Sequence, residues 1–185
     1  MTARQLTPFE HILLGLICLA PASGYDLKRI FAVTPMGIYQ PSSGALYPAL
    51  RRLELMSMVQ ARPGEDGESA RRRRVYEPTE AGQTAHMEWL RTPVDAATVA
   101  RDLGLHLMRF VMMEHVFASE EVVGFLESLA DALAAVVAQL EEYASGADPG
   151  NRHPGLAVGH GLAVHRASLQ WAQSTVQALA AAPAR

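Results

Sequence analysis

The order of predicted elements in the first half of the chain limits the fold more than any other feature. Apolar spacing and capping residues predict three short helices before residue 56. Two short segments rich in β-branched and aromatic residues, 56–61 and 75–78, follow and are typical of strands. The segment 63–69 between them is polar and contains proline and glycine, as hairpin loops do. The expected order is therefore helix, helix, helix, strand, strand.

Local signals mark where the first two helices start. Thr7-Pro8-Phe9-Glu10 combines a capping box with a proline at the first helical position, and the apolar run that follows stops before Pro21. Ser23, with Asp26 three residues later, starts a second helix over 24–32. This helix is expected to expose Lys28 and Arg29 and to bury Tyr25, Leu27, Ile30 and Phe31.

The third helix starts at Ser42-Ser43-Gly44. Its apolar stripe, with spacings of three and four residues, consists of Leu46, Ala49, Leu50 and Leu53. Tyr47 and Arg51 are four residues apart and lie off this stripe, so both are expected at the surface. Pro48 falls about one turn into the helix and removes one backbone hydrogen bond, which marks an unusual helix start.

Four consecutive arginines, 71–74, lead into the returning strand. Val75 is expected to pack inward, with Arg71 and Arg73 on its side and with Arg72 and Arg74 on the side of Tyr76. Adjacent guanidinium groups repel one another, and an anionic partner would relieve that repulsion. Thr79 then caps a further helix over 80–91.

Together these elements predict a winged helix-turn-helix domain over residues 1–92. In such a fold the third helix presents its polar face to the major groove, and the wing carries arginines to a neighbouring groove or to phosphates. The chain has a net charge of −3, but the charge is divided unevenly. Residues 1–91 carry 11 Lys and Arg against 9 Asp and Glu, whereas residues 92–185 carry 5 against 10. Local charge decides what a surface attracts, so the first half suits nucleic acid.

The candidate DNA-contacting residues lie on the second helix, on the start of the third and on the wing. They are Tyr25, Lys28, Ser42, Ser43, Gly44, Tyr47, Arg51, Arg72, Arg73 and Arg74. Small residues at the helix start allow close approach of a phosphate or base edge, and Arg51 suits a guanine edge. The alternatives are an ordinary helix surface, a solvated hairpin, and a Tyr47 that braces the wing.

Residues 93–185, beyond Thr92-Pro93, are predicted to be an all-helical domain. From Ser119 an apolar seam with alternating spacings of four and three runs through Val122, Leu126, Leu129, Leu133, Val136, Leu140 and Tyr143. Residues 148–151 interrupt it, and a weaker seam follows at Leu162, His165, Leu169, Ala172, Val176 and Leu179. Residues 103–117 are apolar on nearly all sides, so that segment is expected to be buried on several sides.

So much apolar helix exceeds what a 93-residue half needs for its own core, so we expect a second copy of the chain to cover part of it. The predicted dimerisation residues are Phe110, Phe117, Leu126, Leu133, Leu140, Leu169, Trp171 and Val176. The alternative is that the seam forms core within one chain only. Met108, Met112 and Met113 either fill that core or line an adaptable effector cavity.

Three stretches resemble the PadR family of bacterial transcriptional regulators. They are Gly24-Tyr25-Asp26-Leu27, residues 43–54 with the letters SGALYPALRRLE, and residues 73–82 with the letters RRVYEPTEAG. The second stretch is specific and includes Pro48. The resemblance extends over about residues 9–180, because the later helices and Trp171 are similar to the helical C-terminal domain of the subgroup with a long tail.

The resemblance implies a homodimeric winged-helix regulator that dimerises through its C-terminal helices. Carried over by position, it implies recognition-helix contacts from Ser42, Ser43, Gly44, Tyr47 and Arg51 and wing contacts from Arg72 to Arg74. The chain departs from the family after the third helix. Family members usually have a glycine between that helix and the first wing strand, whereas this chain reads Met56-Ser57-Met58.

Several other classes of protein lack support in the sequence. The seven histidines have no ligand spacing with cysteines or carboxylates, and no nucleophile–base motif or phosphate loop is present, so we expect neither a metal, nor a cofactor, nor an enzyme. No apolar run reaches the ~18 residues of a membrane span, and the start of the chain does not resemble a secretory signal. With a single cysteine, Cys18, the expected location is the cytoplasm.

The sequence therefore predicts a DNA-binding transcriptional regulator, in particular a repressor that binds a pseudo-palindromic operator as a homodimer. A small-molecule effector, of unknown identity, is expected to act through the C-terminal helices. Two alternatives remain: a transcriptional activator, and a helical protein-interaction module whose winged domain no longer binds DNA. The acidic residues Glu65, Asp66 and Glu68 beside the arginines favour the second alternative slightly.

Overall fold

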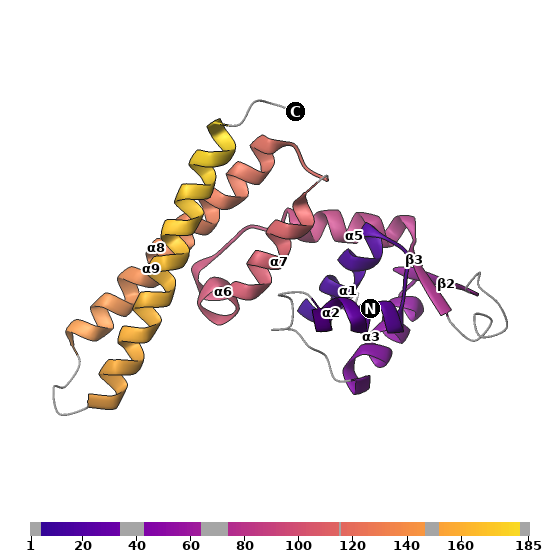
Figure 1. Cartoon of the computed structure of the whole chain (residues 1–185), viewed down its shortest axis with the longest axis horizontal. Helices are drawn as coiled ribbons and strands as arrows, with labels where there is room; N and C mark the ends of the chain where they lie inside the picture. The colour runs from indigo at the N-terminus through magenta and orange to yellow at the C-terminus, as the bar shows by residue number, and fades with distance from the viewer. Residues whose placement is uncertain (1–4, 34–42, 64–73, 115, 147–151, 182–185) are drawn as a thin grey trace. The chain divides into compact units, whose positions relative to one another are not determined.

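The computed structural model of the chain describes residues 5–33, 43–63, 74–114, 116–146 and 152–181. The chain divides into two compact units, Met1–Thr92 and Pro93–Arg185 (Figure 1). The first is a winged-helix unit, in which strands β2 and β3 extend from a cluster of short helices. The second, hereafter the helical unit, contains the two longest helices. The mainly α-helical fold class expected from the sequence is confirmed.

Helix α1, Pro8–Leu19, begins with the predicted capping box. The Thr7 hydroxyl accepts from the Glu10 backbone N–H, and the Glu10 carboxylate accepts from the Thr7 N–H at 2.7 Å. Both bonds satisfy backbone donors that the first turn leaves free. Residues 12–17 are buried, so α1 is the centre of the core of the winged-helix unit.

Helix α2, Gly24–Val33, starts where Ser23 and Asp26 exchange hydrogen bonds. Leu27 and Phe31 are buried as predicted, and Ile30 is half-buried. The predicted burial of Tyr25 is wrong, because its side chain is 61% exposed. Two residues correspond to about 200° of helix rotation, so Tyr25 points away from the face that Leu27 and Phe31 bury.

Helix α3, Ser43–Leu55, buries its predicted stripe of Leu46, Ala49, Leu50 and Leu53 completely. Tyr47 and Arg51 are exposed, as the spacing predicted, and Pro48 lies inside the helix. This helix packs against α1 and α2. Its buried face is fixed by the core, and its other face is therefore held at a defined orientation toward solvent.

The strands form a three-stranded antiparallel sheet in the order β1-β3-β2. The predicted hairpin consists of β2, Val59–Pro63, and β3, Arg74–Pro78. Strand β1, Ala22–Ser23, was not predicted, because two residues carry no alternation signal. β2 starts three residues later than predicted, after Ser57, whose φ of 57° interrupts an extended backbone.

The inward-facing residue of β3 is Tyr76, which is buried, whereas Val75 is only half-buried, so the predicted parity of this strand is wrong. Tyr76 is paired with Ala22 on β1 and with Ala61 on β2. Cross-strand partners share a face, so the ring fills the space that two small residues leave. Arg74 lies on the side of Tyr76, as predicted, and Arg71 to Arg73 lie outside the described residues.

Helix α5, Glu80–Leu90, is capped by Thr79, as predicted. The same hydroxyl also donates to the Ser57 carbonyl oxygen at 2.6 Å, and the Thr79 N–H donates to Met58 O at 3.1 Å. A Cβ at Gly82 would lie 1.9 Å from the Met58 carbonyl oxygen. Only glycine allows this approach of α5 to the start of β2.

The helical unit contains α6, Ala96–Arg101, α7, Leu103–Met113, α8, Ser119–Ser145, and α9, Arg152–Ala181. Helices α8 and α9 lie along one another (Figure 1). The predicted break at 148–151 lies outside the described residues. α7 is shorter than the predicted segment 103–117, and Val111 on it is exposed, so it is not buried on every side. Met108, Met112 and Met113 are buried.

Candidate nucleic-acid interface

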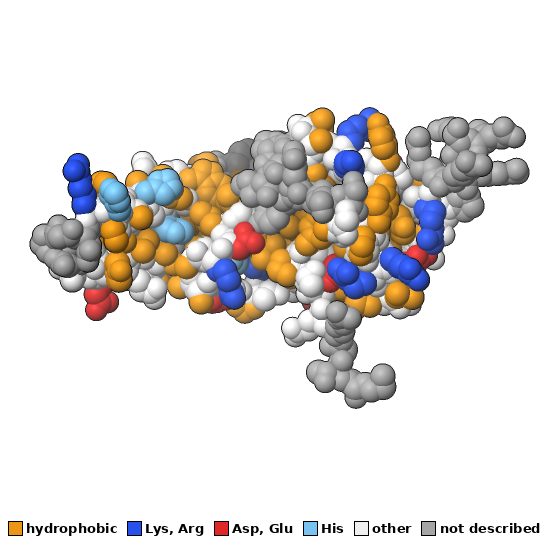
Figure 2. All heavy atoms as spheres, turned by 90° about the horizontal axis from the view of Figure 1, so that it is seen from below, with side chains coloured by type: hydrophobic (Ala, Val, Ile, Leu, Met, Phe, Trp, Pro, Cys, Tyr) orange, Lys and Arg blue, Asp and Glu red, His pale blue; other side chains and the backbone are white. Residues whose placement is uncertain are grey.

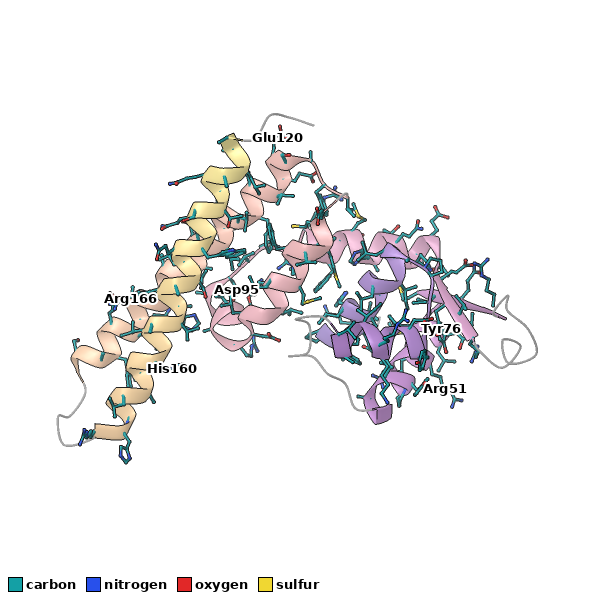
Figure 3. All side chains as sticks on the ribbon, in the orientation of Figure 1. Arg51, Tyr76, Asp95, Glu120, His160 and Arg166 are labelled. Carbon is teal, nitrogen blue, oxygen red and sulfur yellow. The ribbon has the colours of Figure 1, made fainter. Side chains whose placement is uncertain are left out.

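A surface pocket with a volume of about 650 Å³ lies where the start of α2, the outer face of α3 and strand β3 meet. We call it the head pocket. Its lining residues are Ser23, Gly24, Tyr25, Tyr47, Arg51, Glu54, Leu55, Arg74 and Tyr76. Figure 3 labels two of them, Arg51 on α3 and Tyr76 on β3, next to one another at the edge of the winged-helix unit. The pocket brings together Tyr25, Tyr47, Arg51 and Arg74, four of the predicted DNA-contacting residues.

Two tyrosines give the head pocket an exposed aromatic rim. Tyr25 is 61% and Tyr47 is 52% exposed. A Cβ at Gly24 would lie 2.6 Å from Cε1 of Tyr47, so the absence of a side chain there lets the Tyr47 ring lie against the start of α2. This contact fixes one side of the ring, and the other side stays open to solvent.

Arg74 lies at the base of the wing and is held by two neighbours. Its guanidinium is 5.7 Å from the centre of the Tyr76 ring, and its Nη2 donates to Glu54 Oε1 on α3. Burial raises the pKa of Tyr76, and the nearby Arg74 opposes that rise. Strand β3 is thereby tied to α3 by a charged contact, in addition to its pairing with β1 and β2 in the sheet.

A second ion pair ties α3 to the core. Arg52 Nε donates to Glu10 Oε1 at 2.5 Å, and the Glu10 side chain is only 3% exposed. Burial acts to raise the pKa of Glu10, but hydrogen bonds from Thr7 and Arg52 stabilise its charge and hold the pKa below its ordinary value. The capping role of Glu10 was predicted, but its pairing with Arg52 was not, because the two residues are 42 positions apart.

The remaining predicted DNA contacts divide into two groups. Lys28 on α2 and Gly44 on α3 are exposed, and Ser43 begins α3. Ser42, Arg72 and Arg73 lie outside the described residues. Lys and Arg side chains are spread over the face of the winged-helix unit that Figure 2 shows. On the wing itself, Arg62 pairs with Glu77 at 2.8 Å.

The predicted dimerisation residues occupy three environments in the helical unit. Leu126 and Leu133 are fully buried within the unit, as the intrachain alternative expected. Phe110, Phe117, Leu140, Leu169 and Val176 are half-buried. Trp171 is 37% exposed and meets Phe110 edge-on, with ring centres 5.6 Å apart. Two further apolar side chains on α9, Leu156 and Val164, are exposed and were not predicted to be.

A buried polar cluster in the helical unit was also missed. His106 Nε2 lies 3.2 Å from the Thr98 hydroxyl, and its Nδ1 lies 3.3 Å from Nη1 of Arg109. Arg109 stacks on the Phe125 ring at 5.0 Å. Burial lowers the pKa of Arg109 to about 10, and it also lowers the pKa of His106. This cluster could not be predicted, because His106 and Arg109 lie within an apolar helix pattern.

Two kinds of site are missing from the described residues. They contain no group of three or more His, Cys, Asp and Glu side chains placed to hold a metal ion. In the same residues, no helix combines the length and apolar character that crossing a membrane requires.

A family model matches residues 13–88, which include most of the winged-helix unit. The model describes the transcriptional regulator PadR-like family. No curated protein sequence matches the chain.

Several solved structures are similar over nearly the whole chain. Bacillus subtilis PadR in complex with operator DNA is 16% identical, with a TM-score of 0.47, over 94% of this chain and 99% of that one. A PadR-like transcriptional regulator from Bacillus cereus is 20% identical, with a TM-score of 0.43, over 97% and 99%. The Vibrio cholerae virulence activator AphA is 21% identical, with a TM-score of 0.38, over 93% and 98%.

Proposed function

Through its winged-helix unit the chain is a PadR-family transcriptional regulator, and on that premise we propose that it binds double-stranded DNA as a homodimer and represses transcription. Its operator is pseudo-palindromic, and it acts in the cytoplasm without a cofactor or an enzymatic activity. A transcriptional activator is the alternative within the same family.

The observation that carries the proposal is the shared position of Tyr47, Arg51 and Arg74 around the head pocket. A recognition helix needs a buried face that fixes its orientation and an opposite face with side chains that reach base edges. α3 has both, because its apolar stripe is fully buried while Tyr47 and Arg51 stay exposed. The basic balance of residues 1–91 supplies the attraction for phosphates.

Each predicted residue has a role in this proposal. Arg51 reads a guanine edge in the major groove, and Tyr47 contacts the adjacent backbone. Ser42, Ser43 and Gly44 let the duplex approach the start of α3 closely. Lys28 and Tyr25 on α2 contact phosphates, and the wing arginines Arg72 to Arg74 reach the neighbouring groove.

The homodimer is proposed from the exposed apolar side chains of α9. Of the described side chains on this 30-residue helix, only Ala172 is buried. Leu156 is 63% exposed and Val164 is 42% exposed, and together with Trp171 they lie at spacings of eight and seven residues, on one side of the helix. An apolar stripe on a long helix marks a surface that another chain covers. Phe110, Phe117, Leu140, Leu169 and Val176 are half-buried and are proposed to contribute to the same interface.

The dimer presents its two recognition helices about one duplex turn apart, ~34–36 Å. A small-molecule effector in the helical unit, beside Met108, Met112 and Met113, changes that spacing. Such a ligand shifts the equilibrium only by binding one dimer shape more tightly than the other. Repression is thereby relieved when the two helices no longer fit consecutive grooves.

A gel-shift assay on the DNA upstream of the gene tests the proposal. The variants are Arg51→Ala and, as a charge-matched control, Arg101→Ala on the exposed surface of α6. Arg51→Ala is expected to weaken binding by about five- to 150-fold, because a bidentate arginine–guanine contact contributes ~1–3 kcal/mol. Arg101→Ala should change it less than about twofold.

The outcomes separate the candidate functions. If wild-type protein retards no duplex even at low salt, DNA binding is excluded and the helical protein-interaction module is favoured. If it binds but transcription in vitro rises from that promoter, the chain is an activator. Equal losses for Arg51→Ala and Arg101→Ala would mean that only overall charge, and not α3, determines binding.

A further inference from the structure

The head pocket contains one feature that DNA binding alone does not explain: an acidic side chain among its lining residues. Glu54 follows Arg51 by three residues, and residues at this spacing share a side of a helix. Its carboxylate therefore lies beside the surface proposed for DNA. A carboxylate near phosphates repels them, so Glu54 opposes binding unless its charge is used for another purpose.

The partner of Glu54 is Arg74. Glu54 Oε1 accepts from Arg74 Nη2, and the Glu54 side chain is 30% exposed, whereas that of Arg74 is 58% exposed. The same guanidinium is stacked on the Tyr76 ring. Arg74 is thus held between α3 and β3, with its positive charge largely neutralised, while most of its surface remains accessible to an incoming phosphate.

We propose that Glu54 is a positioning and specificity-determining residue of the DNA-binding surface, which holds Arg74 at the base of the wing and makes every phosphate compete for that guanidinium. The proposal rests on the proposed function, because it presupposes that DNA occupies the head pocket.

The competition affects different DNA sequences unequally. A phosphate of an arbitrary duplex has to replace the Glu54 contact with another charge-assisted hydrogen bond, and it leaves the carboxylate uncompensated beside the backbone. On a duplex that Tyr47 and Arg51 have placed in register, the phosphate meets Arg74 in one fixed geometry. The new phosphate contact then compensates for the lost contact between Arg74 and Glu54. Glu54 therefore weakens non-specific binding more than specific binding, which is discrimination by repulsion.

The wing offers a matched control in Arg62 and Glu77. This pair joins β2 to β3 with an Nη2–Oε1 distance of 2.8 Å, and Glu77 is 24% exposed. Glu77 directly follows Tyr76 and so points to the opposite face of the sheet. Glu54→Gln and Glu77→Gln remove the same charge from an arginine partner in the same unit, but only Glu54 lines the head pocket.

The test uses the full chain and a fluorescently labelled duplex of random sequence, whose binding is followed by anisotropy over a series of NaCl concentrations. Glu54→Gln is expected to bind this duplex about three- to tenfold more tightly than wild type at the lowest salt. For this variant, the plot of the logarithm of the DNA-binding constant against log [NaCl] should be steeper by about 0.9, because the released Arg74 guanidinium neutralises one more phosphate. Glu77→Gln should bind within about twofold of wild type and keep its slope, and Glu54→Asp should restore most of the wild-type behaviour.

A double variant shows whether Arg74 transmits the effect. In an Arg74→Ala background, Glu54→Gln should no longer steepen the slope, because the guanidinium that it releases is gone. This comparison also separates the proposed role from a loss of folding, since both members of the pair of variants lack the ion pair.

Three results would overturn the inference. Equal tightening by Glu54→Gln and Glu77→Gln would show a general charge effect. Weaker binding by a Glu54→Gln variant with an unchanged melting temperature would show that the carboxylate supports a contact. A full effect of Glu54→Gln in the Arg74→Ala background would exclude Arg74. The proposed function fails in a different way, namely when wild-type protein shows no salt-dependent binding to any duplex.

Discussion

The helix at the centre of the winged-helix unit, α1, and the last helix of the helical unit, α9, are buried to very different degrees. In α1 every residue from 12 to 17 is buried, whereas on α9 the only described side chain that is buried is Ala172. The first unit has its core around short helices whose ends are fixed by caps. The second has two long helices: α8 buries one face, whereas α9 leaves Leu156, Val164 and Trp171 exposed. This difference supports the proposal that a second copy of the chain covers part of the helical unit.

The largest effect is expected where the helical unit meets its proposed partner. Leu156→Asp combined with Val164→Asp places four carboxylates in the interface of a homodimer. Burying unpaired charges is costly, and we expect the dimer dissociation constant to rise at least about 1000-fold, or ~4 kcal/mol. Analytical ultracentrifugation measures it.

The control for that prediction is Gln173→Asp, which adds a carboxylate at an exposed position of α9 that lies away from the side of Leu156 and Val164. It should leave the dissociation constant nearly unchanged. If the double variant dimerises like wild type, the exposed stripe of α9 is not the interface, and the contrast between the two units loses its explanation.

Replacing glycine with alanine should change the free energy of unfolding in opposite directions in the two units. A Cβ at Gly82 in α5 meets the Met58 carbonyl oxygen at 1.9 Å, so Gly82→Ala is expected to lower the free energy of unfolding by about 3 kcal/mol. At Gly124 in α8 a Cβ meets nothing within 4 Å, so Gly124→Ala should raise it by ~1 kcal/mol through helix propensity. Urea denaturation measures both. A loss of stability for Gly124→Ala would show that this face of α8 is covered by a partner chain.

Acid should weaken the winged-helix unit through His86. This side chain is buried between α5 and its neighbours, and burial lowers its pKa from 6.5 to about 4. Below pH 6.5, His86 therefore binds a proton in the unfolded chain but not in the folded chain. The free energy of unfolding consequently falls as the pH drops toward 4. Between pH 7 and pH 5 the loss due to His86 is about 2 kcal/mol.

Replacing His86 with leucine should remove that part of the pH dependence, whatever it does to stability at pH 7. Urea denaturation at pH 7 and pH 5 measures the difference. His106 in the helical unit also has a lowered pKa, so His106→Leu tests the same relation there. An unchanged pH dependence in His86→Leu would exclude this histidine as the source.

The contrast between the units also explains what the sequence could predict. In the winged-helix unit the caps at Thr7, Ser23 and Thr79 act within three residues of their partners, so element starts and the winged-helix fold followed from local signals. Contacts between distant residues carried no such signal. Tertiary packing of separate elements determines the ion pairs Glu10–Arg52 and Glu54–Arg74 and the pairing of strand β1.

The site was partly predictable for the same reason. Helical spacing placed Tyr47 and Arg51 on the exposed face of α3, and the alternation of β3 placed Arg74 beside Tyr76. The inward face of β3 was assigned to Val75 because a branched apolar residue usually packs inward. The alanines that flank Tyr76 are known only once the register is known. In the helical unit, apolar spacing identified the seam. It could not show which of its residues pack within one chain and which would contact a second copy.

The smallest expected effect is at Ser57, in the turn between α3 and β2. Its φ of 57° is in the left-handed region, which costs a residue with a Cβ about 1–2 kcal/mol, whereas glycine adopts it freely. Part of that gain is offset by the greater freedom of glycine in the unfolded chain, so Ser57→Gly should raise the free energy of unfolding by ~0.5–1 kcal/mol. Urea denaturation with Ser128→Gly as the control, in the middle of α8, should show a loss of about 1 kcal/mol there instead. The Ser57 carbonyl oxygen that accepts from Thr79 belongs to the backbone and is retained in Ser57→Gly. A loss of stability in this variant would therefore mean that the serine side chain also stabilises the turn.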